Sequence, residues 1–257
     1  MSSQVIRNPW VQRIVFLAII LVAWQLFGES VSPIIFSPPT RVVGRFYQLW
    51  MSGPLAFDTL VTIQTILISF VSGLIVAIPM GLAMGRIRLL EYALDPYITL
   101  IYATPTVAVI PLVIIWFGSN LSASYILVLL HVIPPILINT MIGVKVVSKT
   151  LVETGQSFGF RGMKLWRKVV LPASFPYIMA GLRIGMGAAV IGTMVAEIFM
   201  FTTGIGYILV FYASQFDSAA IISGVLIIMA LGILLTELIK FLEHRLAKWS
   251  VSATGVR

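Results

Sequence analysis

Cysteine is absent from this 257-residue chain, and charged residues make up only 10% of it. The absence of cysteine excludes disulfide-stapled scaffolds, thiol catalysis and cysteine metal sites. Ordinary globular chains carry about 25% charged residues, so 9 acidic and 17 basic side chains could not cover a soluble surface of this size. Because 59% of the residues are also hydrophobic, the composition predicts an all-α, polytopic membrane protein.

Nucleotide-binding and metal-binding patterns are also missing. The sequence has no G-x-x-x-x-G-K-[ST] motif, so any nucleotide must be hydrolysed by another chain. No histidine pair or close carboxylate cluster offers a metal site. Ser69 and Ser72 lack the G-x-S-x-G surroundings of a serine nucleophile, and His131 is expected to be structural rather than a proton relay. We therefore expect no enzyme, and no cofactor or metal bound by this chain.

Long uncharged stretches lie between the few charges. There are 27 residues between Asp58 and Arg86 and 49 between Asp95 and Lys145, whereas one membrane-spanning helix needs about 20. The polar turn at 118–122 divides the longer stretch into two spans. The pattern predicts a single membrane domain over residues 1–257, with six transmembrane helices at residues 11–28, 59–85, 97–118, 122–144, 173–200 and 218–240.

Basic residues predict the orientation of these helices. If the N-terminus is cytoplasmic, all but three of the 17 lysines and arginines lie in cytoplasmic segments, the exceptions being Arg41, Arg45 and Arg183. This bias follows the positive-inside rule. It also accounts for the formal net charge of +8 without a nucleic-acid partner. Both termini of this multi-pass protein are therefore expected on the cytoplasmic side of the cell (inner) membrane.

Three segments need separate interpretation. The run 14–27 resembles a signal peptide, but no small-x-small cleavage pattern follows Phe27, so we expect an uncleaved helix. Residues 38–57 contain turn formers and an apolar pattern ending near Trp50, which predicts a short helix at the outer membrane interface. Residues 145–171, hereafter loop 145–171, form the only long cytoplasmic connection. Loops of this length usually have a function.

Loop 145–171 has an internal organisation of its own. We expect a short helix over 148–158, a stop at Gly159 where glycine permits a positive φ, and a second amphipathic helix through Trp166. Pro172 is expected to restart the chain in the first turn of the next helix. Aromatic side chains such as Phe158 lie between the bases and suit contact with a partner protein.

The spacing in this loop resembles the EAA loop of ABC-importer permeases, which has the pattern E-A-A, three residues, G, nine residues, I-x-L-P. Four positions are in register: Glu153, Gly159, Leu171 and Pro172. Thr154 and Gly155 stand where the family has alanine, and Val169 replaces isoleucine. Glycine weakens a helix by about 1 kcal/mol relative to alanine, so Gly155 is expected to loosen the first short helix.

Further segments resemble the nitrate, sulfonate and taurine branch of these permeases. They are Ser37-Pro38-Pro39, Ala103-Thr104-Pro105, Pro111-Leu112, Gly181-Leu182-Arg183-Ile184, Val195-Ala196-Glu197 and Gly204-Ile205-Gly206-Tyr207. The resemblance implies a type I permease fold that pairs with a second permease copy. It also implies two ATP-binding cassette subunits, which bind ATP and Mg, and an extracytoplasmic solute-binding protein. Loop 145–171 would then dock on the ATPase through Glu153, Thr154, Gly155, Phe158, Gly159, Leu171 and Pro172.

The transported solute is left open by the resemblance. A sulfonate, taurine, nitrate or a similar small anion is one class, and a heterocyclic vitamin precursor is another. An autonomous secondary transporter or channel is the competing function. It would need ion-coupling charges in the membrane, where only Arg183 and Glu197 are available.

Arg183 and Glu197 are the two charges in the predicted fifth span. A charge at the bilayer centre costs about 2.5–3.5 kcal/mol on insertion scales, so each should face protein or water. They are candidates for the translocation path. The alternatives are that Arg183 extends to the inner interface and that Glu197 has a structural hydrogen bond. Fourteen residues of helix, at about 1.5 Å each, separate them too widely to pair.

Small residues recur at four-residue spacing in the second predicted span, at Gly73, Ala77, Gly81 and Gly85. A similar pattern in the fifth span includes Gly181 and Gly185. Such stripes let helix backbones approach closely. The partner helix is expected either within the chain or, for the fifth span, across a dimer interface.

Overall fold

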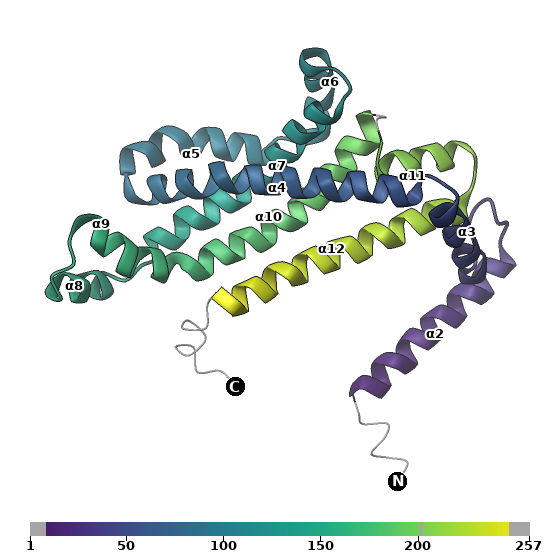
Figure 1. The fold of residues 1–257 in the computed structure, drawn as a ribbon, viewed down its shortest axis with the longest axis horizontal. Helices are drawn as coiled ribbons and strands as arrows, with labels where there is room; N and C mark the ends of the chain where they lie inside the picture. Colours follow the sequence, from purple (N-terminus) through teal and green to yellow (C-terminus); the bar gives the residue numbers. More distant parts are fainter. Residues whose placement is uncertain (1–8, 201–202, 247–257) are drawn as a thin grey trace, which may run out of the picture. The chain divides into compact units, whose positions relative to one another are not determined.

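The computed structural model describes residues 9–200 and 203–246, and within these ranges the regular elements are all helices (Figure 1). They are α2 (Pro9–Ser30), α3 (Pro39–Met51), α4 (Leu55–Arg86), α5 (Arg88–Ala103), α6 (Thr106–Phe117), α7 (Leu121–Lys145), α8 (Lys149–Ser157), α9 (Gly162–Leu165), a π-helical turn (Trp166–Val170), α10 (Leu171–Met200), α11 (Ile205–Ser214) and α12 (Ser218–Leu246). The chain termini, which we predicted to be cytoplasmic, belong to residues 1–8 and 247–257 and lie outside the described residues.

Five helices are long and apolar enough to cross a membrane: Pro9–Ser30, Leu55–Arg86, Leu121–Lys145, Gly162–Met200 and Ser218–Leu246. A sixth span is formed if α5 and α6 are counted together. The all-helical prediction is therefore confirmed, with five to six candidate spans. The polar turn at 118–122 also separates two helices, with the Asn120 side chain accepting the Ala123 N–H at the start of α7.

Residues 97–118, which we predicted to form one span, are bent in the structure. It contains the end of α5 and all of α6, which meet at an angle of 98°. Pro105 causes this break, because a proline disfavours the helical conformation of the residue before it. Thr104 is accordingly extended, with φ −74° and ψ 124°.

The chain forms two compact units, and the first contains residues 9–60 and 203–228. Its core includes Leu49, Leu55, Ile208 and Tyr212. The predicted interfacial segment 38–57 holds α3, which buries Val42 and Leu49 on one side. Asp58 is buried at the start of α4, where its carboxylate accepts the Gly204 N–H at 2.8 Å.

The second unit contains residues 61–200 and 229–246, and α7 forms its centre. The glycine stripe of α4 packs on α7: a Cβ at Gly73 would lie 2.5 Å from Val132, and one at Gly85 2.6 Å from Val144. Gly185 of α10 approaches Ile136 of α7 in the same way, at 2.5 Å. These stripes therefore serve packing within the chain.

Candidate functional site

Loop 145–171 begins with α8, and both ends of this helix are fixed by hydrogen bonds. The Ser148 side chain accepts the Leu151 N–H at 3.3 Å at the first turn. At the other end, Gly159 has a φ of 76°, its N–H donates to Gln156 O at 2.9 Å, and the Phe160 N–H donates to Gly155 O at 3.0 Å. This pair of bonds is a Schellman motif. The predicted helix stop at Gly159 is thus confirmed.

Gly155 has a different role from the one its helix propensity suggests. It is buried, and a Cβ there would lie 2.8 Å from Val169 Cγ2 and 2.9 Å from Leu165 Cδ1. A hydrogen atom at this position lets α8 rest directly on the second half of the loop. The expectation that Gly155 loosens the loop omitted this tertiary contact.

Pro172 lies in the first turn of α10, as predicted, but the expected break before this helix is absent. One helical run extends from Gly162 to Met200. The turn from Trp166 to Val170 is π-helical, and the Leu171 N–H donates to Trp166 O, five residues back. A proline inside an α-helix clashes with the carbonyl four residues before it. The wider π turn directly before Pro172 accommodates the ring, so helix α10 continues through it.

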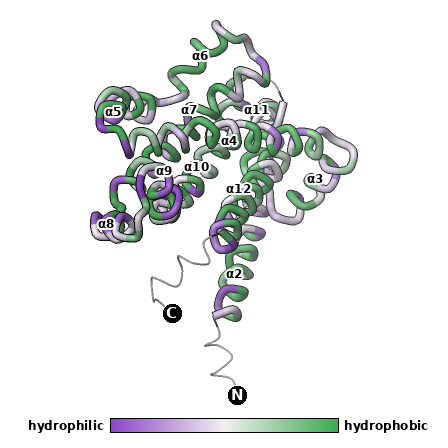
Figure 2. The backbone as a smooth tube through the Cα atoms, turned by 60° about the vertical axis from the view of Figure 1, so that its left-hand side comes forward, coloured by the Kyte–Doolittle hydropathy of each residue, from purple (hydrophilic) through white to green (hydrophobic). Residues whose placement is uncertain are grey.

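Loop 145–171 leaves polar and apolar side chains accessible. Phe158 is 76% exposed and Met163 60% exposed. The Glu153 side chain is exposed as well, and none of the ion pairs found in residues 9–200 and 203–246 includes it. Thr154 is also exposed, with its hydroxyl bonded to Thr150 O at 2.7 Å. Figure 2 shows this hydrophilic character at α8 and α9, in contrast to the mainly hydrophobic α4. Loop 145–171 therefore exposes both polar and apolar side chains on a backbone held by hydrogen bonds.

Residues 155–159 read Gly-Gln-Ser-Phe-Gly and so match the G-x-S-x-G pattern of hydrolase nucleophiles. That pattern acts as a nucleophile only on a sharp strand-to-helix turn. Here Ser157 ends a helix, and its hydroxyl donates to Glu153 O at 3.0 Å. The match is therefore part of the loop architecture and not an active site.

Arg183 and Glu197 each have a partner on another helix. Arg183 forms an ion pair with Glu243 of α12. Glu197 is 2% exposed and accepts the Thr62 hydroxyl of α4 at 2.9 and 3.0 Å to its two carboxylate oxygens. The structure does not bring the two charges together. The hydrogen bond at Glu197 is the structural alternative considered above for that residue, and the two roles considered for Arg183 stay predictions.

A cavity of about 310 Å³ adjoins the break between α5 and α6. It is lined by residues 101–106, by Leu130 and His131 of α7, and by Ala188 and Ile191 of α10. His131 Nδ1 lies 3.1 Å from Leu127 O, which fixes the ring. Sequence reasoning missed this cavity, because it depends on the bend at Pro105. The motif Ala103-Thr104-Pro105 was the available signal.

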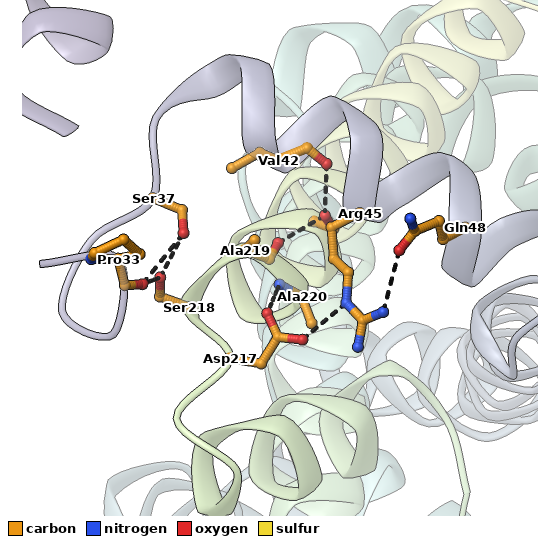
Figure 3. Close-up of polar contacts among 10 residues, drawn as sticks. Pro33, Ser37, Val42, Arg45, Gln48, Asp217, Ser218, Ala219 and Ala220 are labelled. Carbon is orange, nitrogen blue, oxygen red and sulfur yellow. Dashed lines mark hydrogen bonds and ion pairs between the residues drawn. The ribbon is translucent and has the colours of Figure 1, made fainter. Parts of the chain in front are cut away.

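The first unit contains a polar network centred on Asp217 (Figure 3). The Asp217 carboxylate accepts the Ala220 N–H at 3.0 Å, which caps α12, and pairs with Arg45 Nε of α3 at 2.8 Å. Ser218 Oγ donates to Pro33 O at 2.6 Å and lies 2.8 Å from Ser37 Oγ. The network joins residues 33–45 to residues 217–220, and because these two segments are distant in sequence, no local pattern indicated it.

Comparison with known proteins agrees with this geometry. The family model for the inner membrane component of binding-protein-dependent transport systems matches residues 73–248. A putative aliphatic sulfonates transport permease of Bacillus subtilis is 31% identical over 97% of this chain and 91% of its own length. The taurine transport system permease of Escherichia coli is 29% identical, covering 91% and 87%. A riboflavin transport system permease of Chloroflexus aurantiacus is 33% identical, covering 93% and 90%.

The fold and the relatives define a multi-pass permease subunit of the inner membrane. The chain belongs to the family of inner membrane components of binding-protein-dependent transport systems, in the branch that resembles sulfonate and taurine permeases. Permeases of this family are non-catalytic subunits that associate with an ATPase and a solute-binding protein. An autonomous channel or secondary transporter, left open by the sequence, does not fit this membership.

Proposed function

We propose that this permease forms half of the translocation path of an ATP-driven importer for a small organic anion, and that loop 145–171 transmits ATPase closure to the membrane helices. Two permease copies and two ATP-binding subunits would make the transporter. An ATPase can shift the permease only through contacts that differ between its own open and closed states. The loop is the segment suited to make such contacts.

The construction of loop 145–171 is the observation that carries this proposal. Its two halves are held against each other at Gly155, and the chain direction between them is set by the bonds at Gly159. The second half continues without interruption into α10. A displacement of α8 is therefore passed to a membrane-spanning helix through a hydrogen-bonded backbone. The exposed Glu153 and Phe158 supply the contacts with the partner.

A small organic anion is favoured as the solute because two of the relatives are described as permeases for sulfonates and taurine. The riboflavin permease keeps a heterocyclic solute as the second candidate. We place the path near the cavity at the α5–α6 break, which offers the hydroxyls of Thr104 and Thr106 and the imidazole of His131. No acidic residue lines this cavity, which suits an anion. Arg183 and Glu197 remain candidate path residues for mutational test.

Reconstitution tests the proposed coupling. The chain is co-purified with its ATP-binding subunit, and ATP hydrolysis in liposomes is measured with and without solute-loaded binding protein. Glu153→Ala removes the only acid of loop 145–171 and should lower the stimulated hydrolysis at normal permease levels. Lys149→Ala, which removes a charge at the start of the same helix α8, is the matched control and should keep the stimulated hydrolysis. Solute uptake by the wild-type permease alone, without any ATPase, would refute the proposal.

Labelling tests the orientation. The chain has no cysteine, so single cysteines can be introduced without background. Ser52→Cys, Asn120→Cys and Ser214→Cys should react with an impermeant reagent from outside sealed, right-side-out vesicles. Arg88→Cys and Ser157→Cys should react only after the vesicles are opened. Outside labelling of Ser157→Cys would invert the topology and remove loop 145–171 from the ATPase side.

A further inference from the structure

A second cavity, of about 370 Å³, lies between the end of α4 and the second half of loop 145–171. Its walls are almost wholly apolar and come from Leu82, Ala83, Ile87, Met163, Trp166 and Leu171. Met163, Ile87 and Leu171 are themselves exposed, which makes the cavity open on one side. Neither the family description nor the proposed coupling assigns a role to this cavity.

Two arginines complete the lining of this cavity. Arg86 comes from the last turn of α4 and Arg167 from the π-helical turn. The Arg86 guanidinium lies over the Trp166 ring, 5.2 Å from its centroid. Neither arginine takes part in an ion pair within residues 9–200 and 203–246, and no acidic residue lines the cavity. The site therefore combines two unneutralised positive charges with an apolar wall, which suits an anion with an apolar body.

The position of the cavity relative to the membrane narrows the choice of anion. Candidate span α4 ends at Arg86, and the candidate span Gly162–Met200 begins in the second half of loop 145–171. The ends of both candidate spans line the cavity, so the surface of a bilayer around these helices would lie near it, whichever way the chain is oriented. Phospholipids are the amphipathic anions present there at high concentration. Basic pockets between membrane helices at the interface favour anionic lipid head groups.

We propose that this cavity binds one anionic phospholipid of the surrounding bilayer. Its phosphate would lie between Arg86 and Arg167, because a guanidinium matches phosphate oxygens with two parallel hydrogen bonds. An acyl chain would follow Leu82, Ile87 and Leu171. A bound lipid would hold the end of α4 to the π-helical turn and so stiffen the connection between loop 145–171 and α10. Lipid binding does not depend on the solute or on the ATPase.

Native mass spectrometry of the purified whole chain tests this proposal directly. The protein is titrated with phosphatidylglycerol and with phosphatidylcholine of the same acyl chains. We expect wild-type protein to retain one phosphatidylglycerol with a preference of roughly thirtyfold, from two interfacial arginines. Arg86→Gln combined with Arg167→Gln should reduce this preference to near unity. Arg88→Gln combined with Lys168→Gln removes two neighbouring charges that do not line the cavity, and should keep most of it.

A second variant guards against misfolding of the double arginine variant. Ala83→Trp fills the cavity while both arginines stay, and it should lower phosphatidylglycerol retention about tenfold or more. Glycerol phosphate, which carries the head-group charge without acyl chains, should not displace the lipid. Equal retention of the two lipids by wild-type protein, or unchanged preference in both variants, overturns the proposal. Displacement by glycerol phosphate at matched concentration would overturn the lipid assignment and indicate a site for soluble organophosphates.

Discussion

Loop 145–171 and the network around Asp217 satisfy their polar groups in different ways. Around Asp217, both carboxylate oxygens have partners within the chain, namely Ala220 N–H and Arg45 Nε. In the loop, the backbone bonds at Gly159 are complete, but the Glu153 side chain is exposed. The loop thus has a fixed backbone and an accessible acidic side chain, whereas the charges of the Asp217 network are partly exposed but paired within the chain.

This difference suggests that loop 145–171 serves contact with a partner protein, whereas the Asp217 network stabilises the fold. A carboxylate that caps a helix and pairs with an arginine contributes to holding its own elements together. A carboxylate on a rigid, exposed helix contributes little to folding and is available to a partner. Mutations in the loop should therefore affect coupling with little change in protein level. Mutations around Asp217 should lower the protein level with little change in coupling. The following predictions test this contrast.

The largest effect is expected for Gly159→Val. A β-branched residue at a φ of 76° is strained by about 1–3 kcal/mol and must re-aim the chain between α8 and α9. No atom lies within 4 Å of a Cβ at this position, so the effect is one of backbone conformation and not of crowding. Stimulated ATP hydrolysis should fall about tenfold or more, while membrane levels stay normal.

Gly159→Asn provides the matched control for this effect. Asparagine tolerates the left-handed conformation far better than valine, so most of the stimulated hydrolysis should return. If asparagine and valine behave alike, the left-handed turn is not the cause of the defect. If both variants couple like wild type, the loop is not the transmitting element.

A smaller effect is expected for Asp217→Ala, and it should be on stability instead of coupling. The substitution removes the cap of α12, worth about 1–2 kcal/mol, and a partly exposed ion pair worth less than about 1 kcal/mol. Thermal stability should drop by several degrees, whereas hydrolysis per assembled transporter should change little. Asp217→Asn keeps the cap and should recover most of the stability. Loss of coupling without loss of stability would contradict the division between the two regions.

Gly155→Ala should have a still smaller effect, which appears in stimulated hydrolysis. An increase would show that helix propensity dominates at this position, and a decrease would show that packing dominates. Alanine strengthens an isolated helix by about 1 kcal/mol, but its Cβ would press on Leu165 and Val169 at 2.9 and 2.8 Å. We expect packing to dominate and stimulated hydrolysis to fall about two- to fivefold. Val169→Ala added to Gly155→Ala should restore part of the activity. Improved coupling in Gly155→Ala alone would show that propensity matters more.

Features that depend on local chemistry could be predicted from the sequence. Uncharged runs indicated the five helices that are long and apolar enough to cross a membrane, and the positive φ of Gly159 agrees with the predicted helix stop. The register of Glu153, Gly159 and Pro172 also indicated the family, which the match over residues 73–248 confirms. These signals arise from bilayer thickness and backbone sterics, which act on short stretches of chain.

Features that depend on which helices meet could not be predicted. The tight fit of Gly155 against Val169 is a contact between two halves of a loop, and propensity gave the opposite expectation. Continuity of the helix through Pro172 required the π-helical turn before it. The partners of Arg183 and Glu197 lie 60 and 135 residues away in the sequence. Long-range pairing of this kind leaves no periodic trace in one sequence.

The smallest effect is expected for Glu197→Gln. This substitution tests whether the buried Glu197 carboxylate stabilises the chain, like Asp217, or contributes to transport. Glu197 accepts the Thr62 hydroxyl, and a glutamine oxygen can accept the same hydrogen bond without a charge. Uptake should therefore change by less than about twofold. Glu197→Leu has similar bulk but no acceptor for the Thr62 hydroxyl, so this buried hydrogen bond is lost and assembled protein should decrease. A strong loss of uptake in Glu197→Gln at normal protein level would instead assign the charge to the solute path. Measuring uptake and membrane level together distinguishes these outcomes, because a structural defect lowers both and a path defect lowers only the first.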